Sequence, residues 1–406
     1  MCAGMIAFIF SVLFAATPAL AQGTPSPDTI IKRQDQTGDG RISRQEWAGP
    51  PHRFEVLDLN SDGYLTKREL EQGIAAVKAA RAFDQPLIDV HTHIGGYPSQ
   101  ALQERVSTDY SKAVDQAIQH MDRHNVRTSV VMDPPAIIPM LVSSEPLFAQ
   151  AKRYQGRFAV LGGGGTLNPI IQRAAPEEVT PGIRREFEAL AEDLLKAGAI
   201  GFGEIAALHF SFFKQHPFED TRPDHPLLLL LADIAARHDV PIDLHCELVA
   251  QDRPVPKLLV ERGSHNPQQV HSNIAALERL LAHNPKARII LSHSSDATGD
   301  RTAEVIGGLM ARHPNLLMSL NVLPQFAFPQ NLALRASGPI KPEWVRLIER
   351  YPDRFLLGSD QFYRDLCPSC KMIDTLTPSL RWLQLLPSDL SRRVALDNPR
   401  RVFKLR

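Results

Sequence analysis

The fold of this chain is constrained most by an alternation of short apolar runs and longer amphipathic stretches that begins near residue 84. Short runs rich in β-branched and aliphatic residues predict strands, and stretches with apolar residues three or four positions apart predict helices. Strands are predicted at 87–90, 128–132, 158–162, 199–205, 241–245, 289–293, 316–322 and 355–359. Helices are predicted at 109–124, 184–196, 226–238, 274–283, 303–312 and 342–351, with a last helical region at 388–403.

Strands that alternate with helices pair in parallel through right-handed crossovers. Eight such strands over residues 84–406 predict an α/β fold, a closed (β/α)8 TIM barrel. A doubly wound open sheet is the alternative. Such a sheet would not bring the ends of the first, fourth, fifth, sixth and eighth strands to one point, whereas a closed barrel does.

The first predicted strand continues into His91-Thr-His93. Residues i and i+2 of a strand face the same side, so the two imidazoles point together and can bind one divalent ion. The pair alone is weak support, because two histidines at a strand end also occur as a hydrogen-bonded polar pair. The prediction of a metal site therefore depends on the other strand ends.

Four further strand ends carry residue types that bind metals. Glu204 follows the fourth strand, His245 ends the fifth, His293 ends the sixth and Asp360 follows the eighth. Barrel enzymes place their sites at the carboxyl ends of the strands. Histidines and carboxylates at five separate strand ends therefore predict one shared centre that includes the histidine pair of the first strand.

With these residues the sequence resembles the amidohydrolase superfamily, and its ligand residues resemble those of TatD-like members. The resemblance extends over residues 86–406 and includes the closing segment Asp397-Asn398-Pro-Arg-Arg-Val-Phe403. It implies metal ligands at His91, His93, Glu204, His245, His293 and Asp360. It also implies that Asp360 is the catalytic residue, which accepts a proton from a water held between the metals.

The resemblance further implies how the ligands divide between two metals. Asp360 and the histidines of the first strand would bind the first metal, and His245 and His293 the second. Glu204 would bridge the two, where many relatives have a carboxylated lysine. Two nearby cations lower the pKa of a shared water and polarise a carbonyl or phosphoryl oxygen. Glu204 therefore favours two metals over the single metal of the superfamily's deaminases and decarboxylases, with zinc preferred over manganese, iron or nickel.

Several other residues have ordinary structural interpretations. The glycines at 162–165 predict a flexible loop near the mouth of the site, because no clear helix start follows to complete a phosphate cradle. Cys246 is predicted to be a small buried residue near the site. Cys367 and Cys370 are candidates for a local disulfide in an oxidising compartment. Solvated loop histidines are predicted at His209, His216, His265 and His271.

Residues 28–80 contain two copies of a loop that resembles the EF-hand position by position. Its calcium-ligating positions are Asp35, Thr37, Asp39, Arg41 and Glu46 in the first copy and Asp58, Asn60, Asp62, Tyr64 and Glu69 in the second. Calcium binds six to eight oxygens, and Arg41 and Tyr64 would supply backbone carbonyls. Ile42 and Leu65 would lie in short strands that pair the two loops. The resemblance predicts a small α-helical EF-hand pair before the barrel, with calcium in a structural role.

The first 21 residues predict a cleaved export signal, because an apolar run at 5–16 is followed by Ala19 and Ala21 at the spacing of a signal peptidase site. The run is shorter than the roughly 20 residues that span a bilayer. The mature chain is therefore expected in the periplasm or outside the cell, without a membrane segment. Lys and Arg together number 45, as do Asp and Glu, so the net charge does not favour a nucleic-acid partner.

The leading hypothesis is a metal-dependent hydrolase that cleaves an ester, lactone, amide or phosphoester bond of a small molecule with a metal-activated water. A non-hydrolytic decarboxylase on the same barrel is one alternative. A calcium-dependent binding protein without catalysis is another, and it would tolerate the loss of His91. A TatD-type nuclease is a further alternative and would need a positively lined cleft.

Overall fold

The computed structural model describes residues 26–48, 54, 57–58, 62–71, 86–95, 110–137, 144–212, 216–263, 265–294, 298–322, 340–364 and 372–406. The chain divides into two compact units, Met1–Ile74 and Ala75–Arg406. The larger unit holds the alternating strands and helices, and the smaller unit holds the two acidic loops.

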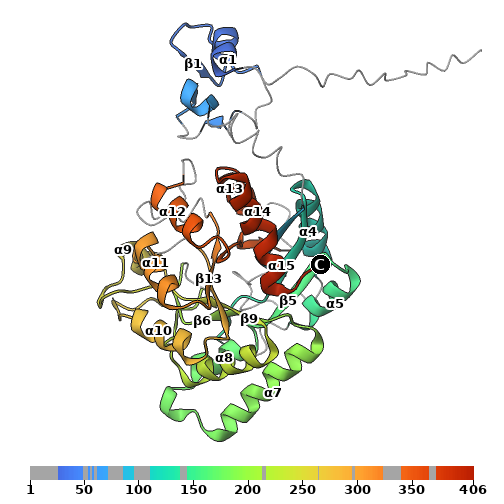
Figure 1. The fold of residues 1–406 in the computed structure, drawn as a ribbon, viewed down its shortest axis with the longest axis vertical. Helices are drawn as coiled ribbons and strands as arrows, with labels where there is room; N and C mark the ends of the chain where they lie inside the picture. Colours follow the sequence, from blue (N-terminus) through green and yellow to red (C-terminus); the bar gives the residue numbers. More distant parts are fainter. Residues whose placement is uncertain are drawn as a thin grey trace, which may run out of the picture. The chain divides into compact units, whose positions relative to one another are not determined.

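A parallel sheet forms the centre of the larger unit (Figure 1). Its strands are β3 (Leu87–Ile94), β4 (Val126–Met132), β5 (Phe158–Gly163), β6 (Phe202–Ala206), β9 (Pro241–His245), β12 (Arg288–Leu291), β13 (Leu316–Leu320), β14 (Phe355–Leu357) and β15 (Gln361–Tyr363). They pair in the order β14-β13-β12-β9-β6-β5-β4-β3-β15. β14 pairs with β13 and β15 pairs with β3, so the two edges of the curled sheet belong to one interrupted eighth strand. The predicted (β/α)8 fold is confirmed.

Helices surround the sheet (Figure 1). They are α4 (Ser111–Arg123), α5 (Glu145–Arg153), α6 (Leu167–Arg173), α7 (Pro181–Ala197), α8 (Pro226–His238), α9 (Lys257–Arg262), α10 (Ile274–His283), α11 (Ala303–Arg312), α12 (Pro342–Arg350), α13 (Leu376–Leu383), α14 (Ser388–Arg392) and α15 (Asn398–Phe403). A 3-10 turn (Pro176–Glu178) precedes α7, and a π-helical turn (Arg393–Asp397) joins α14 to α15. The sequence prediction does not include helices α5, α6, α9 and α13, which are short, with six to nine residues each.

Two short antiparallel hairpins lie in the loops that follow β6 and β9. In the first, β7 (Leu208–His209) pairs with β8 (Glu219–Asp220). In the second, β10 (Arg253–Pro254) pairs with β11 (Gln269–Val270). Loops at the carboxyl ends of barrel strands surround the site, so these hairpins form part of its wall.

Local sequence explains where the longest helix begins and ends. Thr180 precedes α7 and accepts a hydrogen bond from the backbone N–H of Ile183 at 3.2 Å, and Pro181 occupies the first helical position. Gly198 ends the helix with a φ of 111°, a left-handed conformation that glycine adopts without steric cost. Phe187 is fully buried and anchors the helix to the sheet.

The barrel has an inner and an outer apolar layer. The outer layer packs helices against strands and includes Phe202 and Phe355, each fully buried. Burying such a side chain stabilises the fold by roughly 1.5–3 kcal/mol. The inner layer fills the barrel below the site and includes Val90 and Ile290, and Phe403 of α15 belongs to the same cluster. The carboxyl end of the strands carries buried histidines and carboxylates, which can form a site.

The prediction of a flexible loop at glycines 162–165 is wrong. These residues are buried, and α6 begins at Leu167, with Thr166 between the glycines and the helix. A Cβ on Gly164 would lie 2.3 Å from the backbone oxygen of Asp133, which no side chain tolerates. The glycines therefore permit a close approach between the loops after β4 and β5 rather than movement.

The smaller unit is built around α1 (Pro27–Gln34), β1 (Arg41–Ser43) and β2 (Tyr64–Thr66). β1 and β2 pair antiparallel with Ile42 opposite Leu65, as the sequence predicts for two EF-hand loops. Both side chains are fully buried in an apolar cluster with Phe54.

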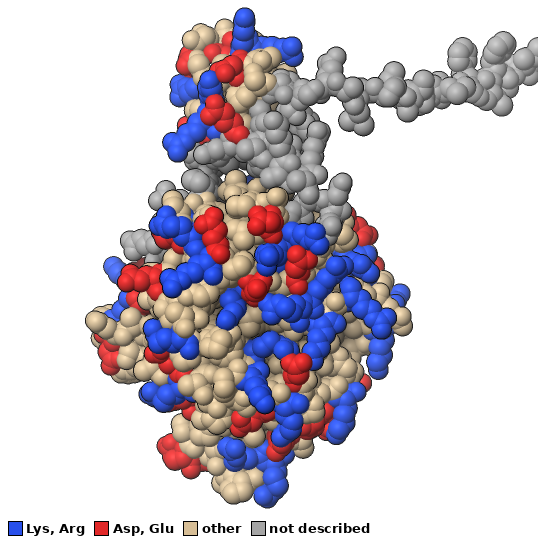
Figure 2. All heavy atoms as spheres, viewed as in Figure 1, with Lys and Arg blue, Asp and Glu red and all other residues tan. Residues whose placement is uncertain are grey.

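Some predictions fall on other parts of the chain. The export signal, Asn60, Cys367 and Cys370 lie outside the described residues. Among the described residues, no helix is long and apolar enough to cross a membrane. On the face of the barrel unit seen in Figure 2, Lys and Arg are interspersed with Asp and Glu.

Candidate metal centre

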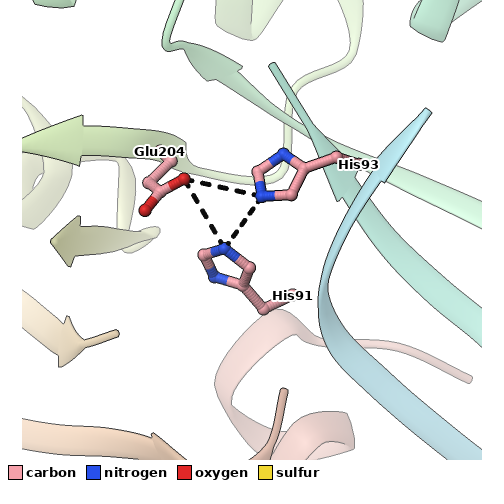
Figure 3. A group of neighbouring side chains, drawn as sticks. All are labelled: His91, His93 and Glu204. Atoms are coloured by element: carbon pink, nitrogen blue, oxygen red, sulfur yellow. Dashed lines mark hydrogen bonds and ion pairs between the residues drawn. The ribbon is translucent and has the colours of Figure 1, made fainter. Parts of the chain in front are cut away.

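The two histidines of β3 converge on Glu204 of β6 (Figure 3). The Nε2 atoms of His91 and His93 lie 3.2 Å apart, and they lie 3.6 and 3.5 Å from Oε2 of Glu204. All three side chains are buried. Such spacings are those of separate ligands around one ion, since nitrogen and oxygen ligands lie about 2.0–2.2 Å from zinc.

A register irregularity in β3 helps to aim His91. Asp89 pairs with Ser129 and Thr92 with Val131, so β3 advances by three residues over a stretch in which β4 advances by two, which is a β-bulge. Such bulges occur next to active sites, where they redirect a side chain. As a result, Val90 belongs to the inner apolar layer while the next side chain, His91, also faces the interior.

Asp360 completes the first group of ligand atoms. Its Oδ1 lies 3.4 Å from Nε2 of His93 and 3.9 Å from Nε2 of His91. The backbone N–H of Asp360 donates to the carbonyl of His91 at 2.9 Å, which fixes the end of the eighth strand against the first.

A second group lies on the other side of the bridging carboxylate. Oε1 of Glu204 lies 2.8 Å from Nδ1 of His245 and 3.5 Å from Nε2 of His293. The two oxygens of Glu204 therefore face two different histidine pairs. The structure brings together all six residues that the sequence assigns to this centre, and their role as metal ligands stays a prediction.

Two of these residues have an unusual backbone. His293 and Asp360 have φ angles of 65° and 56°, in the left-handed region that non-glycine residues seldom adopt. Holding such a conformation costs on the order of 1–3 kcal/mol and is common at functional sites.

Other buried groups orient the imidazoles. Asp243 lies 3.2 Å from Nδ1 of His91, and the carbonyl of Met132 lies 3.0 Å from Nδ1 of His93. An acceptor at Nδ1 fixes the proton there and leaves Nε2 with its lone pair for a metal. In the second group the imidazole of His245 is turned the other way, with its Nδ1 toward Glu204. Glu247 lies 3.7 Å from Nε2 of His245 and orients the ring from that side.

Electrostatics match this arrangement. Burial opposes charge on His91, but Asp243 and Glu204 outweigh it and raise the pKa of His91 well above its ordinary value. Burial also opposes charge on His245, yet Glu204 and Glu247 raise its pKa to about 9. For Glu204, hydrogen bonds from the histidines overcome burial and hold its pKa well below the ordinary value. In the metal-free site, His91 and His245 therefore tend to be protonated, and a bound cation would take the place of these protons beside Glu204.

The donor set suits divalent transition metals. Three groups of three side chains have ligand atoms within 4.8 Å of one another: His91, His93 and Glu204; His91, His293 and Asp360; and Glu204, His245 and His293. Neutral imidazoles and carboxylates bind zinc, manganese, iron or nickel. The residues present therefore fit one or two such ions.

The prediction that His209 and His216 are solvated is wrong, whereas His265 and His271 are exposed as predicted. His209 and His216 are each 8% exposed. The hairpin of β7 and β8 places His209 against His245, with ring centroids 4.0 Å apart. The cause is the hairpin itself, which sequence periodicity does not reveal because each of its strands has two residues.

Glu219 lies opposite His209 in this hairpin and is not anticipated from the sequence. It is 1% exposed, its Oε2 lies 3.2 Å from Nδ1 of His209, and Asn168 donates to its Oε1 at 2.6 Å. Burial raises the pKa of Glu219 to about 8.

Two further buried polar residues, at the second and seventh strand ends, are not anticipated from the sequence. Asp133 follows β4 directly, and Asn321 follows β13, where its Nδ2 lies 3.3 Å from Nδ1 of His293. Burial raises the pKa of Asp133 to about 6. The same strand-end rule that found Glu204 would have found both residues. Cys246, by contrast, is buried beside the site as predicted.

The acidic loops of the smaller unit are folded around their predicted calcium positions. Asp35 accepts from the N–H groups of Gly38 and Gly40 at 2.7 and 2.8 Å, and Asp58 accepts from that of Gly63 at 2.9 Å. Glu46 turns back into its loop, and hydrogen bonds from Ser43 and then Thr37 lower its pKa to about 2.

The second loop is arranged in the same way. Asp62 accepts from the N–H of Tyr64 at 2.9 Å, and Glu69 accepts from the N–H of Thr66 at 2.8 Å. In the first loop, Asp39 accepts from the N–H of Arg41 at 2.9 Å. In both loops, therefore, the described carboxylates at the ligating positions accept hydrogen bonds from backbone N–H groups of their own loop.

Comparison with known families decides the relationship of the larger unit. The family described as Amidohydrolase matches residues 88–405, which is most of the chain. The chain belongs to the amidohydrolase family. The family described as EF hand matches residues 52–74, which contain the second acidic loop. This amidohydrolase therefore has an EF-hand in its smaller unit.

Solved structures similar to this amidohydrolase include proteins with different reactions. A probable 2-pyrone-4,6-dicarboxylic acid hydrolase from Acinetobacter baumannii is 13% identical, with 79% of this chain and 100% of that chain covered and a TM-score of 0.45. A dihydroxybenzoic acid decarboxylase from a Polaromonas species, with bound manganese, is 16% identical, with 79% and 97% covered and a TM-score of 0.44.

A mutant of an organophosphorus hydrolase from Deinococcus radiodurans is 14% identical to this amidohydrolase, with 80% of this chain and 94% of that chain covered and a TM-score of 0.47. Membership of the family, together with the clustered histidines and carboxylates, supports a metal-dependent enzyme that acts on a small molecule.

Proposed function

We propose that this amidohydrolase is a two-metal hydrolase of carbonyl or phosphoryl compounds, with an ester, lactone, amide or phosphoester as its substrate. One observation carries the proposal. The two oxygens of Glu204 face different histidine pairs, with Oε2 near His91 and His93 and Oε1 near His245 and His293. A carboxylate so placed suits a bridge between two ions, and a single-metal decarboxylase does not need one.

Divalent ions, when bound, supply Lewis acidity that lowers the pKa of a water and polarises the bond to be broken. The chain's own residues supply the proton transfers. Oδ1 of Asp360, which lies 3.4 Å from His93, would accept a proton from the attacking water and deliver it to the leaving group. Asp243 and Glu247 would keep the imidazoles oriented for this geometry.

Two further parts of the proposal concern the rest of the chain. The loops with Asp35 and Asp58 would bind calcium, which would hold the smaller unit folded in a calcium-rich extracellular setting. Residues 1–21 would direct export to the periplasm or the medium and would then be removed, and residues 28–80 and 84–406 would form the EF-hand and barrel domains.

The test is a substrate panel run with the metal-loaded mature protein and its E204Q variant. The panel contains esters, lactones, amides, phosphoesters and hydroxybenzoic acids. Wild type is expected to hydrolyse at least one class, and E204Q is expected to lose at least about 100-fold in kcat/KM, as when one essential electrostatic group is removed. Release of CO2 from a hydroxybenzoic acid, undiminished in E204Q, would instead favour the decarboxylase.

A further inference from the structure

Arg364 directly follows β15. Alternate residues of a strand face the same side, so Arg364 lies on the same side as Phe362. Asp360 precedes β15 with a φ of 56° and reaches the same centre through its contact with His93. The ring of Phe362 stacks on His93 with centroids 4.2 Å apart, and the guanidinium carbon of Arg364 lies 4.7 Å from the centroid of the Phe362 ring. Arg364 is therefore one ring away from a proposed metal ligand, at the mouth of the barrel.

The guanidinium of Arg364 has no directly paired acid among the described residues, and the carboxylate of Asp360 acts on it only at longer range. No hydrogen bond or ion pair joins it to a described residue, and its Nε is a buried atom without a hydrogen-bond partner among them. The terminal nitrogens mark the difference from the buried Arg301, whose Nε also lacks a hydrogen bond to a described residue but whose Nη1 and Nη2 donate to the carbonyls of Ser292 and Cys246 at 2.5 and 2.6 Å. Asp360, whose charge acts on Arg364, is directed at His93 instead.

A half-buried cation without a directly paired counter-charge is costly, because it has lost water and gained no ionic partner in contact with it. Burial lowers the pKa of Arg364 and the charge of Asp360 acts in the opposite direction. Arginine nevertheless stays protonated in proteins. Its planar fork matches a carboxylate in two parallel hydrogen bonds, and stacking on an aromatic ring holds the fork in place.

We propose that Arg364 binds a carboxylate of the substrate, so that this enzyme acts on molecules that carry a free acid group a few bonds away from the bond that is cleaved. The inference rests on the proposed function for the cleavage step only. The ring of Phe362 separates His93 from the guanidinium of Arg364, so the substrate would bridge the span of about one aromatic ring between the metal centre and the arginine. The arginine side chain reaches back over Phe362, which leaves a short gap for the substrate to bridge.

The experiment uses the full metal-loaded mature chain and two esters that differ in one charge, 4-nitrophenyl hydrogen glutarate and 4-nitrophenyl methyl glutarate. R364Q is expected to raise KM for the acid ester about 10- to 100-fold and to leave the methyl ester unchanged within twofold. R312Q, which removes an exposed arginine paired with Glu278 on the outer helices, is the matched control and should behave as wild type. Equal effects of R364Q on both esters would overturn the proposal.

A second experiment measures binding alone and does not depend on turnover of a substrate. Calorimetry with glutarate and with acetate separates a carboxylate held by Arg364 from one held only by metals, because acetate is too short to reach both. Wild type should bind glutarate more tightly than acetate, and R364Q should abolish that difference. Equal binding of the two acids by wild type, or no change in R364Q, would refute the role of Arg364.

The outcomes separate the two proposals. If wild type hydrolyses neither ester nor any compound of the panel, the hydrolase assignment fails and the glutarate arm still decides on Arg364. If circular dichroism shows that R364Q does not fold, R364K replaces it. Lysine keeps the charge but loses the fork, so R364K should weaken glutarate binding at least threefold, and unchanged binding would count against the proposal.

Discussion

Asp243 tests how the first histidine of the centre is held. Its carboxylate lies 3.2 Å from Nδ1 of His91, both side chains are fully buried, and Ser292 donates its hydroxyl to the same carboxylate. In D243N one oxygen remains to accept from His91, the charge is lost, and the other oxygen becomes an NH2 group to which the Ser292 hydroxyl can turn as an acceptor. A hydrogen bond to a charged group contributes about 1.5–3 kcal/mol and a neutral one about 0.5–1.5 kcal/mol. The difference of about 1–1.5 kcal/mol corresponds to roughly 5- to 13-fold weaker metal binding.

The assay is a zinc titration of metal-free protein against a competing chelator, which separates a first and a second binding step. D243N should weaken the step that involves His91 and leave the step at His245 and His293 unchanged, because those imidazoles have no hydrogen bond to Asp243. D243A should weaken the same step toward 100-fold, because the Nδ1 proton loses its acceptor. D353N, in an exposed pair with Arg393, is the control.

Equal weakening of both zinc steps in D243N would contradict this reasoning, since the effect would then come from general damage to the fold. Unchanged zinc binding at both steps would show that Asp243 does not orient His91. Thermal unfolding of the metal-free variants separates the two cases, because a positioning role changes metal affinity more than the stability of the metal-free protein.

Three further predictions follow from the same contacts. The pKa of His245 is raised to about 9, so the protonated imidazole stabilises the metal-free protein fully below about pH 6.5, and this stabilisation is lost as the pH rises to 9. The Tm of the metal-free protein should therefore fall over that pH range while its zinc affinity rises, and E204Q should make both properties less dependent on pH. The pKa of Glu219, raised to about 8, means that its ionisation opposes folding as pH rises from about 4.5 to 8, so E219Q should gain on the order of 1 kcal/mol in urea unfolding at pH 9 and nothing at pH 4; a gain at both pH values would contradict this. E46Q and E69Q should each remove one calcium from equilibrium dialysis, whereas loss of both ions from either variant would mean that the loops bind as one unit.

Much of the fold follows from sequence because strand and helix periods are local properties. The predicted positions of α8, α10 and α11 agree with the structure at both ends, since a proline begins α8, a capping threonine precedes α11, and all three helices bury several apolar side chains. The rule that barrel sites lie at the carboxyl ends of strands likewise predicted that six side chains meet at one centre. It applies because the closure of a barrel follows from the number and order of its strands.

What the sequence did not reveal depends on contacts between distant segments. His209 and Glu219 are brought together by a hairpin of two-residue strands, too short for any periodic signal. Gly164 was misjudged because the backbone of Asp133, which approaches it, lies in another loop. The unpaired charge of Arg364 is likewise visible only when its surroundings are known.

The most direct test of the central claim is the metal content of the purified mature protein, measured by elemental analysis beside E204Q. Because Glu204 presents one oxygen to each histidine pair, and the amide nitrogen of glutamine cannot act as a ligand, wild type should hold two transition-metal ions per chain and E204Q no more than one. Calcium is counted separately in the same measurement. Wild type that contains no transition metal and takes up none on soaking, or E204Q that retains two, would contradict the account.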